Sequence, residues 1–178
     1  MISEAPPRRR WLTALLLTVV LLLAAMWVYA FGFAPRGGVN PVRDKAWTDG
    51  AQAVCLATGA QLAPLVFHTQ ITSSNKDLDV PKFVTNLDRA VIVVSGMLDQ
   101  LDAVPRTSDK AKVLVPQWLT DYRQWVADLR SWIDQLRQGQ IIPFGVSITN
   151  TGIPIDERIN AFATENRIKP CRIDQLQG

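Results

Sequence analysis

Histidine is nearly absent from this sequence, since His68 is the only one among 178 residues. A serine hydrolase needs a nucleophile, a histidine base and an orienting acid brought together, and no GxSxG motif accompanies His68. A Walker phosphate-binding loop, a dinucleotide fingerprint and a haem-attachment motif are missing as well. We therefore expect a protein that is not an enzyme, with an enzyme that uses His68 as the remote alternative.

Patterns of metal ligands are equally scarce. The only two cysteines, Cys55 and Cys171, stand more than a hundred residues apart, so they form neither a CxxC redox motif nor a zinc site. Three oxygen-bearing residues alternate like the first ligands of a calcium loop: Asn75, Asp77 and Asp79. That loop needs a glycine where Val80 stands and a glutamate where Asn86 stands. We expect no bound metal and no cofactor.

An excess of positive charge is also missing from most of the chain. The net charge is +3, but Arg8, Arg9 and Arg10 lie at the amino end, and from Ala34 onward 16 basic residues face 15 acidic ones. A nucleic-acid-binding domain needs basic residues gathered on one face. The sequence therefore predicts no nucleic-acid partner.

A long apolar run is what the chain does contain. From Trp11 to Phe33 there are 23 residues without a charge. A helix of that length extends roughly 34 Å, which exceeds the ~30 Å hydrocarbon core of a bilayer. Trp11, Trp27 and Tyr29 lie near the two ends, where aromatic rings favour the headgroup level. The run predicts a transmembrane helix with the lipid bilayer as partner.

Flanking charge favours a cytoplasmic amino terminus, because the three arginines at positions 8–10 directly precede the apolar run. The predicted organisation is a cytoplasmic basic tail (1–10), a transmembrane helix (11–33), a linker (34–43) and an extracytoplasmic domain (44–178). Small residues at Ala30, Gly32 and Ala34 leave a cleaved signal peptide as the alternative. Signal peptides have shorter apolar regions of about 7 to 15 residues, so we favour an uncleaved anchor.

The two cysteines follow the span, which places them in an oxidising compartment if the domain is exported. A disulfide between Cys55 and Cys171 would stabilise the fold by roughly 4 to 5 kcal/mol in the chain-entropy model. Two buried free thiols are the alternative, because cysteine is often buried without a partner. We expect the disulfide.

The rest of the chain reads as helical. A first helix should begin at Pro41 or Asp44 and be kinked or ended by Pro64. Regular apolar spacing predicts helices over 80–103, from Ser108 or Pro116 to Gly139, and over 155–166. Residues 141–149 suit a short strand or an extended packing segment. The fold class is all-α: a transmembrane helix followed by an antiparallel bundle of three to four helices.

One heptad pattern covers residues 119–139. The six inner positions a and d are Leu119, Tyr122, Val126, Leu129, Ile133 and Leu136. One flank carries Trp118, Trp125 and Trp132, and the other carries Arg123, Arg130 and Arg137. We expect the tryptophans to face another helix of the same bundle. The alternative is that they form an exposed surface for a partner. The arginines should be a solvated flank, with an anionic lipid or protein partner as the alternative.

Four features together carry a resemblance: the amino-terminal span, Cys55 in the first helix after it, "WLTDYRQWVADLRSW" (118–132) and "INAFATENRIKPC" (159–171). With them the chain resembles a group of small actinobacterial single-pass membrane proteins. The members of that group are uncharacterised. The resemblance therefore implies a topology and a cysteine pair, and it implies no activity and no site residues.

Two functional hypotheses remain beside the remote enzyme. The first is a non-enzymatic, membrane-anchored scaffold or accessory protein of a cell-envelope complex, with a protein partner that the sequence does not identify. The second is a carrier or sensor of a lipid or another apolar ligand, with the kinked first helix and the tryptophans lining a pocket. The sequence does not specify an oligomeric state.

Overall fold

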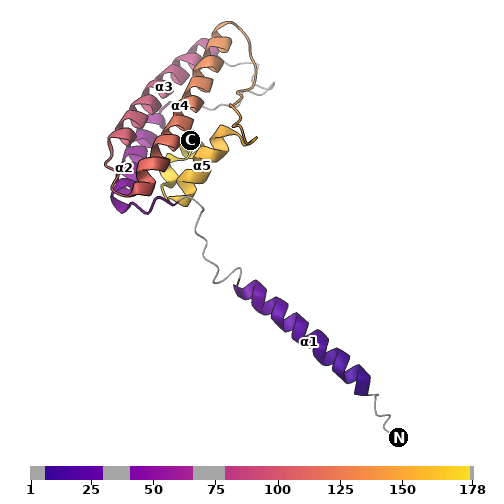
Figure 1. Ribbon diagram of the computed structural model, residues 1–178. Helices are drawn as coiled ribbons and strands as arrows, with labels where there is room; N and C mark the ends of the chain where they lie inside the picture. Colours follow the sequence, from indigo (N-terminus) through magenta and orange to yellow (C-terminus); the bar gives the residue numbers. More distant parts are fainter. Residues whose placement is uncertain (1–6, 30–40, 66–78, 177–178) are drawn as a thin grey trace. The chain divides into compact units, whose positions relative to one another are not determined.

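The structure is a computed structural model that describes residues 7–29, 41–65 and 79–176 (Figure 1). The chain divides into two compact units, Met1–Gly37 and Gly38–Gly178. The first unit contains helix α1, and the second contains every other described helix. No strand occurs in these described ranges, which confirms the predicted all-α class with one apolar helix before a helical bundle.

Helix α1 (Pro7–Val28) is apolar and has no buried side chain among its described residues. Its window Trp11–Val28 has a mean hydropathy of 2.4, and 0% of it is buried inside the protein. By length and composition the helix can cross a membrane, and a signal sequence would meet the same criteria. The predicted span continues to Phe33, but residues 30–33 lie outside the described part.

Helix α2 (Lys45–Leu62) opens the second unit. Asp44 is its N-cap, because the carboxylate accepts a hydrogen bond from the backbone N–H of Trp47 at 3.2 Å. The helix ends before Pro64, which cannot donate a backbone hydrogen bond. Both boundaries agree with the prediction.

Helix α3 (Val80–Ala103) has the predicted bounds, and Asp79 caps it by accepting from the backbone N–H of Lys82 at 3.1 Å. Helix α4 (Asp109–Arg137) begins at the earlier of its two predicted starts, where the Ser108 hydroxyl accepts from the backbone N–H of Ala111 at 3.0 Å. Pro116 therefore lies inside the helix and does not begin it.

The chain between α4 and α5 is extended. Gly139 ends α4 with a φ of +79°, a left-handed conformation that glycine adopts without strain. Ile148 and Pro154 form one isolated antiparallel bridge, so the segment is an extended packing segment and not a strand. Helix α5 (Ile155–Glu165) follows, one residue shorter than predicted. A 3-10 turn η2 (Lys169–Cys171) and a short helix α6 (Ile173–Leu176) complete the domain, and neither was predicted.

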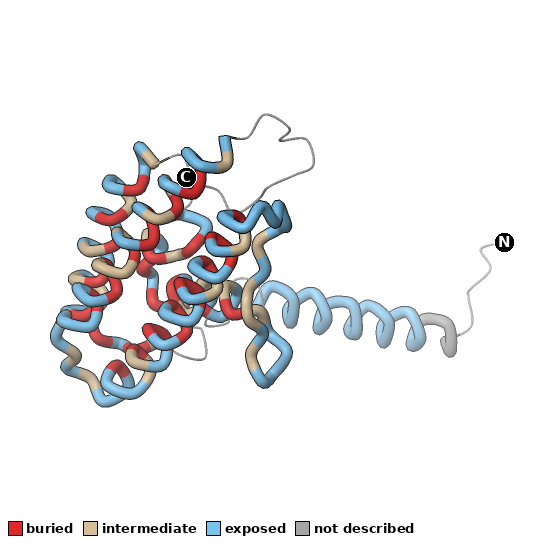
Figure 2. Tube along the Cα trace, turned by 90° about the horizontal axis from the view of Figure 1, so that it is seen from above, coloured by how far each residue is buried: buried red, intermediate tan, exposed pale blue. Residues whose placement is uncertain are grey.

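The helices of the second unit form a closed ring of neighbours. Helix α3 packs between α2 and α4, α5 packs on α4, and the tail formed by η2 and α6 packs on both α5 and α2 (Figure 1). Buried residues line the inward sides of these elements, while their outward sides are exposed (Figure 2). All six predicted inner positions of α4 are buried, which confirms the heptad assignment.

Candidate functional site

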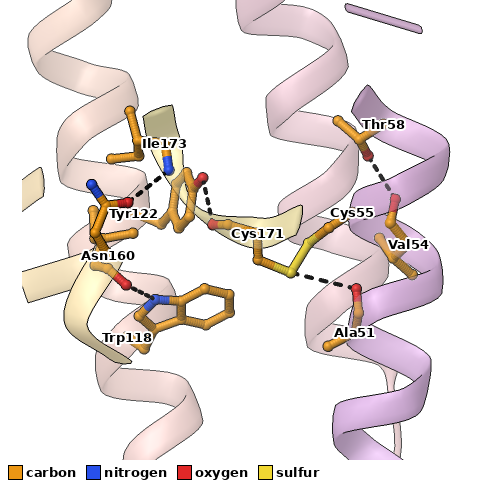
Figure 3. The surroundings of a disulfide bond; sticks show 10 residues. Ala51, Val54, Cys55, Thr58, Trp118, Tyr122, Asn160, Cys171 and Ile173 are labelled. Carbon is orange, nitrogen blue, oxygen red and sulfur yellow. Dashed lines mark hydrogen bonds between the residues drawn. A yellow bond between two sulfur atoms is a disulfide. The ribbon is translucent and has the colours of Figure 1, made fainter. Parts of the chain in front are cut away.

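A disulfide fastens the tail to α2 and closes the ring (Figure 3). The sulfur atoms of Cys55 and Cys171 are 2.01 Å apart, and both residues are fully buried. The hydroxyl of Tyr122 donates to the carbonyl oxygen of Cys171 at 3.1 Å. Burial raises the pKa of Tyr122, and the nearby carboxylate of Asp174 adds to the rise, so this hydroxyl stays a donor. The cysteine pair is structural in this arrangement.

The three tryptophans of α4 lie in the core. Trp118, Trp125 and Trp132 are 2%, 1% and 3% exposed. The indole N–H of Trp118 donates to the Ile159 carbonyl at 3.2 Å, and that of Trp132 donates to the Ile142 carbonyl at 2.7 Å. The expectation that these rings face the inside of their own domain is therefore confirmed. The alternative of an exposed partner surface is wrong, because other parts of the same domain cover the rings.

Two phenylalanines, Phe162 and Phe144, pack on the tryptophans of this apolar flank. The ring of Trp118 stacks on Phe162 of α5, with centroids 5.1 Å apart. The rings of Trp125 and Trp132 both contact Phe144, at centroid distances of 6.1 and 5.4 Å. Phe144 lies in the extended segment, where no helical periodicity signals burial. A lone aromatic in an apolar stretch was the only available signal for its role.

The arginines on the opposite flank of α4 face α3 at matching seven-residue intervals. The rungs of this ladder are Arg123 with Asp102 at 3.0 Å, Arg130 with Ser95 at 3.1 Å, and Arg137 with Asp88 at 2.6 Å. Hydrogen bonds from Arg106 and Arg123 lower the pKa of Asp102. Hydrogen bonds to Asp88 and Asp134 raise the pKa of Arg137. The flank is solvated, as expected, and its outer rungs are ion pairs between helices.

The middle rung pairs a charged residue with a neutral one, which gives a first prediction. Ser95→Asp should place a carboxylate opposite Arg130 and raise the free energy of unfolding by about 0.5 kcal/mol, a typical value for an exposed pair. Urea denaturation at low salt measures this gain. The gain should vanish in about 1 M NaCl, where the screening length is only ~3 Å. A gain that persisted in high salt would have to come from packing or helix propensity.

A polar junction joins the start of α2 to the start of α4 and the end of α5. The Asp44 carboxylate accepts from the backbone N–H groups of Thr107 at 2.5 Å and Ser108 at 2.9 Å. The Ser108 hydroxyl donates to the Val42 carbonyl at 2.8 Å. The N–H of Val42 donates to the side-chain oxygen of Asn166 at 2.7 Å. We call Val42, Asp44, Ser108 and Asn166 the polar junction.

The carboxylate of Asp44 is buried yet favoured in its charged form. Desolvation by burial raises its pKa, but the backbone hydrogen bonds from Ser108, Trp47 and Thr107 outweigh that effect, and the net pKa is lowered from 3.8. An acid whose pKa is lowered by folding stabilises the native state above its unfolded pKa. That stabilisation is lost as the pH falls through the folded pKa.

Asp44→Ala should accordingly destabilise the domain by about 2 to 4 kcal/mol at pH 7, since it removes a helix cap and leaves buried donors without an acceptor. The difference from the wild type should shrink as the pH falls below 3.8 toward the lowered folded pKa, because the unfolded chain then binds a proton that the native carboxylate resists. Urea unfolding curves at pH 7 and at pH 2.5 measure both effects. Asp49→Ala is the control, because Asp49 is exposed and its one ion pair among the described residues is with exposed Lys45. Equal losses in the two variants would contradict the role of the junction.

A cleft of about 530 Å³ lies between α4 and α5. Trp118 and Phe162 form its apolar part, while Asp121 and Arg158 form a bidentate ion pair, with Nε to Oδ2 at 2.6 Å. Asp121 is only 8% exposed. With Leu119 at position a of the heptad, Asp121 falls at position c, which is an outward position. It is buried because α5 covers it. The cleft can accommodate a small apolar or aromatic group, with a guanidinium at its edge.

Exposed aliphatic side chains gather on the extended segment. Residues 138–155 contain no charged side chain, and four isoleucines there are exposed: Ile141, Ile142, Ile148 and Ile153. The Asp128 carboxylate holds the segment on α4 by accepting from the Ser147 backbone N–H at 2.7 Å and from its hydroxyl at 2.8 Å. The segment is thus fixed to the domain at Ser147.

The remaining candidate residues contribute no site in the described ranges. His68, Asn75 and Asp77 lie outside the described residues, and Asp79 serves as the cap of α3. Within the part of the chain that the structure describes, no group of three or more histidine, cysteine or acidic residues could hold a metal ion.

Comparisons with protein-family models, with curated proteins and with solved structures found no match to this chain. The class of protein is therefore set by its own features, which are an apolar helix followed by a disulfide-closed helical domain. The resemblance to the actinobacterial group stays a prediction.

Proposed function

We propose that the protein is a non-enzymatic, membrane-anchored scaffold or accessory subunit of a cell-envelope complex, with its helical domain outside the cytoplasm. The observation that carries this proposal is the exposed apolar surface of Trp11–Val28, in a chain whose second unit has a core of its own. An apolar helix of this length is stable in a bilayer and costly to leave in water. Within it, the Thr18 hydroxyl donates to the Ala14 carbonyl at 3.0 Å, as a polar group in lipid requires.

The disulfide supports an extracytoplasmic location for the domain. Disulfides persist in oxidising compartments and are rare in the cytosol, where thiols are kept reduced. The arginines at positions 8–10 support the same orientation, because positive residues beside a span favour the cytoplasmic side.

The scaffold role is supported by how the domain uses its polar side chains. Asp44 joins two helix starts, Asp121 pairs with Arg158 across α4 and α5, and Asp128 holds the extended segment. Each of these carboxylates fixes the relative position of two elements. The relative positions of these elements are thereby fixed, which suits a domain that presents one constant surface to a partner.

Membrane fractionation with protease treatment tests the anchor and its orientation. The full chain, tagged at each end in turn, should remain in the membrane fraction after carbonate washing. Protease added outside the cytoplasmic membrane should remove a tag at residue 178 and spare a tag at residue 1. A mature protein that starts after residue 30 would show that α1 is a cleaved signal and would refute the anchor.

Native mass after extraction in a mild detergent tests the scaffold role. The chain has a mass of 19.8 kDa, and a subunit of a complex should run with heterologous proteins in stoichiometric amounts. Recovery of only this chain, as monomer or homo-oligomer, would refute the scaffold role while leaving the anchor intact.

A carrier or sensor of an apolar ligand is the second candidate, and the cleft between α4 and α5 favours it. Its volume of about 530 Å³ lies in the range of small-molecule sites, and Trp118 and Phe162 provide apolar contact. Organic extraction of the purified protein followed by mass spectrometry should reveal a stoichiometric lipid. Ala161→Trp should fill the cleft and remove that lipid, and a lipid retained in this variant would exclude the cleft as its site.

A further inference from the structure

Helix α3 has an outward face that no described element covers. The face consists of residues spaced by four and three positions, which lie along one side of a helix: Thr85, Arg89, Ile92, Gly96, Asp99 and Ala103. Five of the six are exposed, and Gly96 is intermediate. Ile92 is 71% exposed, more than any other large hydrophobic residue in the described part of the second unit. We call these six residues the α3 outer face.

The α3 outer face is complementary to itself. If two copies of α3 pack antiparallel about a two-fold axis at the level of position 94, Ile92 meets the partner's Gly96. Arg89 then meets the partner's Asp99, because the members of each pair are equidistant from position 94. By the same rule Thr85 meets the partner's Ala103. We propose that the α3 outer face is a homodimer interface in which α3 packs antiparallel on α3 of a second copy.

Gly96 provides the first support, because its own fold does not need a glycine there. A Cβ atom added to Gly96 would have no heavy atom of any other described element within 4 Å. Glycine in a helix interior is destabilising relative to alanine, so its presence without a local packing reason requires another explanation. In the antiparallel pair it lets the two backbones approach closely and leaves a hollow for Ile92.

Two charges provide the second support. Arg89 and Asp99 form no ion pair among the described residues, whereas Asp88 and Asp102 on the neighbouring side of α3 pair with arginines of α4. Asp99 borders a shallow groove with Arg123 and Arg130, yet it forms no ion pair with either. In the antiparallel arrangement, Arg89 of each copy would lie opposite the partner's Asp99. Two ion pairs would form, one on each side of the two-fold axis.

The same observations select a second copy over an unrelated partner. A site for an unrelated protein would need only one member of each pair on this face, because the partner would supply the other. This face carries both members: Ile92 and the hollow at Gly96, and the charges of Arg89 and Asp99. An isologous contact uses one patch on both subunits and requires this self-complementarity. The inference goes beyond the proposed function, and it does not depend on attachment to a membrane.

Charge reversal of the full chain in detergent micelles tests the interface. Arg89→Asp and Asp99→Arg should each bring two pairs of like charges together and weaken dimerisation about tenfold or more, as measured by analytical ultracentrifugation. The double variant restores opposite charges and should dimerise like the wild type. A wild type that stays monomeric at all concentrations, or a double variant no better than the singles, would overturn the proposal.

A second set of variants tests the packing. Gly96→Leu should abolish the dimer through steric overlap while raising the melting temperature of the monomer, because leucine is the better helix former and its Cβ atom would be free of contacts with other described elements. Ile92→Ala should weaken the dimer, and the control Val113→Ala on exposed α4 surface should leave it unchanged. A Gly96→Leu protein that still dimerised like the wild type would show that α3 does not form the interface.

Discussion

Replacing Cys55 and Cys171 together with alanine is expected to lower the free energy of unfolding by about 4 to 5 kcal/mol. The bond links residues 116 positions apart, so it restricts most of the unfolded domain. It also joins the tail to α2, where the ring of helices closes. Urea denaturation of the purified protein in detergent, followed by tryptophan fluorescence, measures the difference.

Reduction of the wild type provides the internal control for this prediction. Dithiothreitol should shift the wild-type curve close to that of the double variant and leave the double variant unchanged. The tail also buries Ile168, Ile173 and Leu176, so part of its attachment is apolar packing. A loss below about 1 kcal/mol would mean that this packing alone holds the tail in place.

Trp118→Ala is expected to destabilise the domain by about 3 to 5 kcal/mol, the range for removing a large aromatic side chain from a core. The ring is 2% exposed, stacks on Phe162 and meets Trp47 edge to face at a centroid distance of 6.0 Å. Its indole N–H bond to the carbonyl of Ile159 would be lost as well. Thermal and urea unfolding both report the change.

Trp11→Ala is the matched control for that substitution, because Trp11 is an exposed tryptophan of α1. It should leave the unfolding of the second unit unchanged. Trp118→Phe should fall between the wild type and the alanine variant, since it retains a ring and loses the N–H donor. A small effect of Trp118→Ala, comparable to that of Trp11→Ala, would contradict the burial of this residue in a packed core.

The four longer helices of the second unit, α2 to α5, could be predicted because their signals are local. In α3, apolar residues recur at steps of three and four, and Asp79 stands where an N-cap is needed. In α4, the heptad identifies the inner seam without knowledge of any partner helix. A periodic pattern and a cap lie within one stretch of sequence, so no distant contact has to be known.

The surroundings of the tryptophans could not be predicted in the same way. Whether Trp125 is exposed depends on where Phe144 lies, and Phe144 belongs to a segment with no regular period. The heptad indicates that α4 has a wide apolar face, but it does not indicate which element covers it. The cleft at Asp121 was missed for the same reason, because α5 determines the burial of that carboxylate.

The polar junction shows a related limit. Asp44 and Ser108 were each one of two predicted starts for their helices, and the structure selects both as N-caps. The sequence did not indicate that the carboxylate of Asp44 also accepts from the backbone at Thr107 and Ser108, more than sixty residues away. One carboxylate can accept hydrogen bonds from the backbone of two helices, and only the packing of the two helices shows that it does.

The polar junction also determines how the domain would respond to a pulling force. If the amino-terminal end of the domain were bonded only to α2, a pulling force could unfold that helix one turn at a time. Here Val42 is bonded through its N–H to the end of α5 and through its carbonyl to the start of α4, while Asp44 bonds to the same start. A pulling force applied at Pro41 would therefore act on α2, α4 and α5 at the same time. The hydrogen bonds of the junction would have to break together before any one of these helices could unfold.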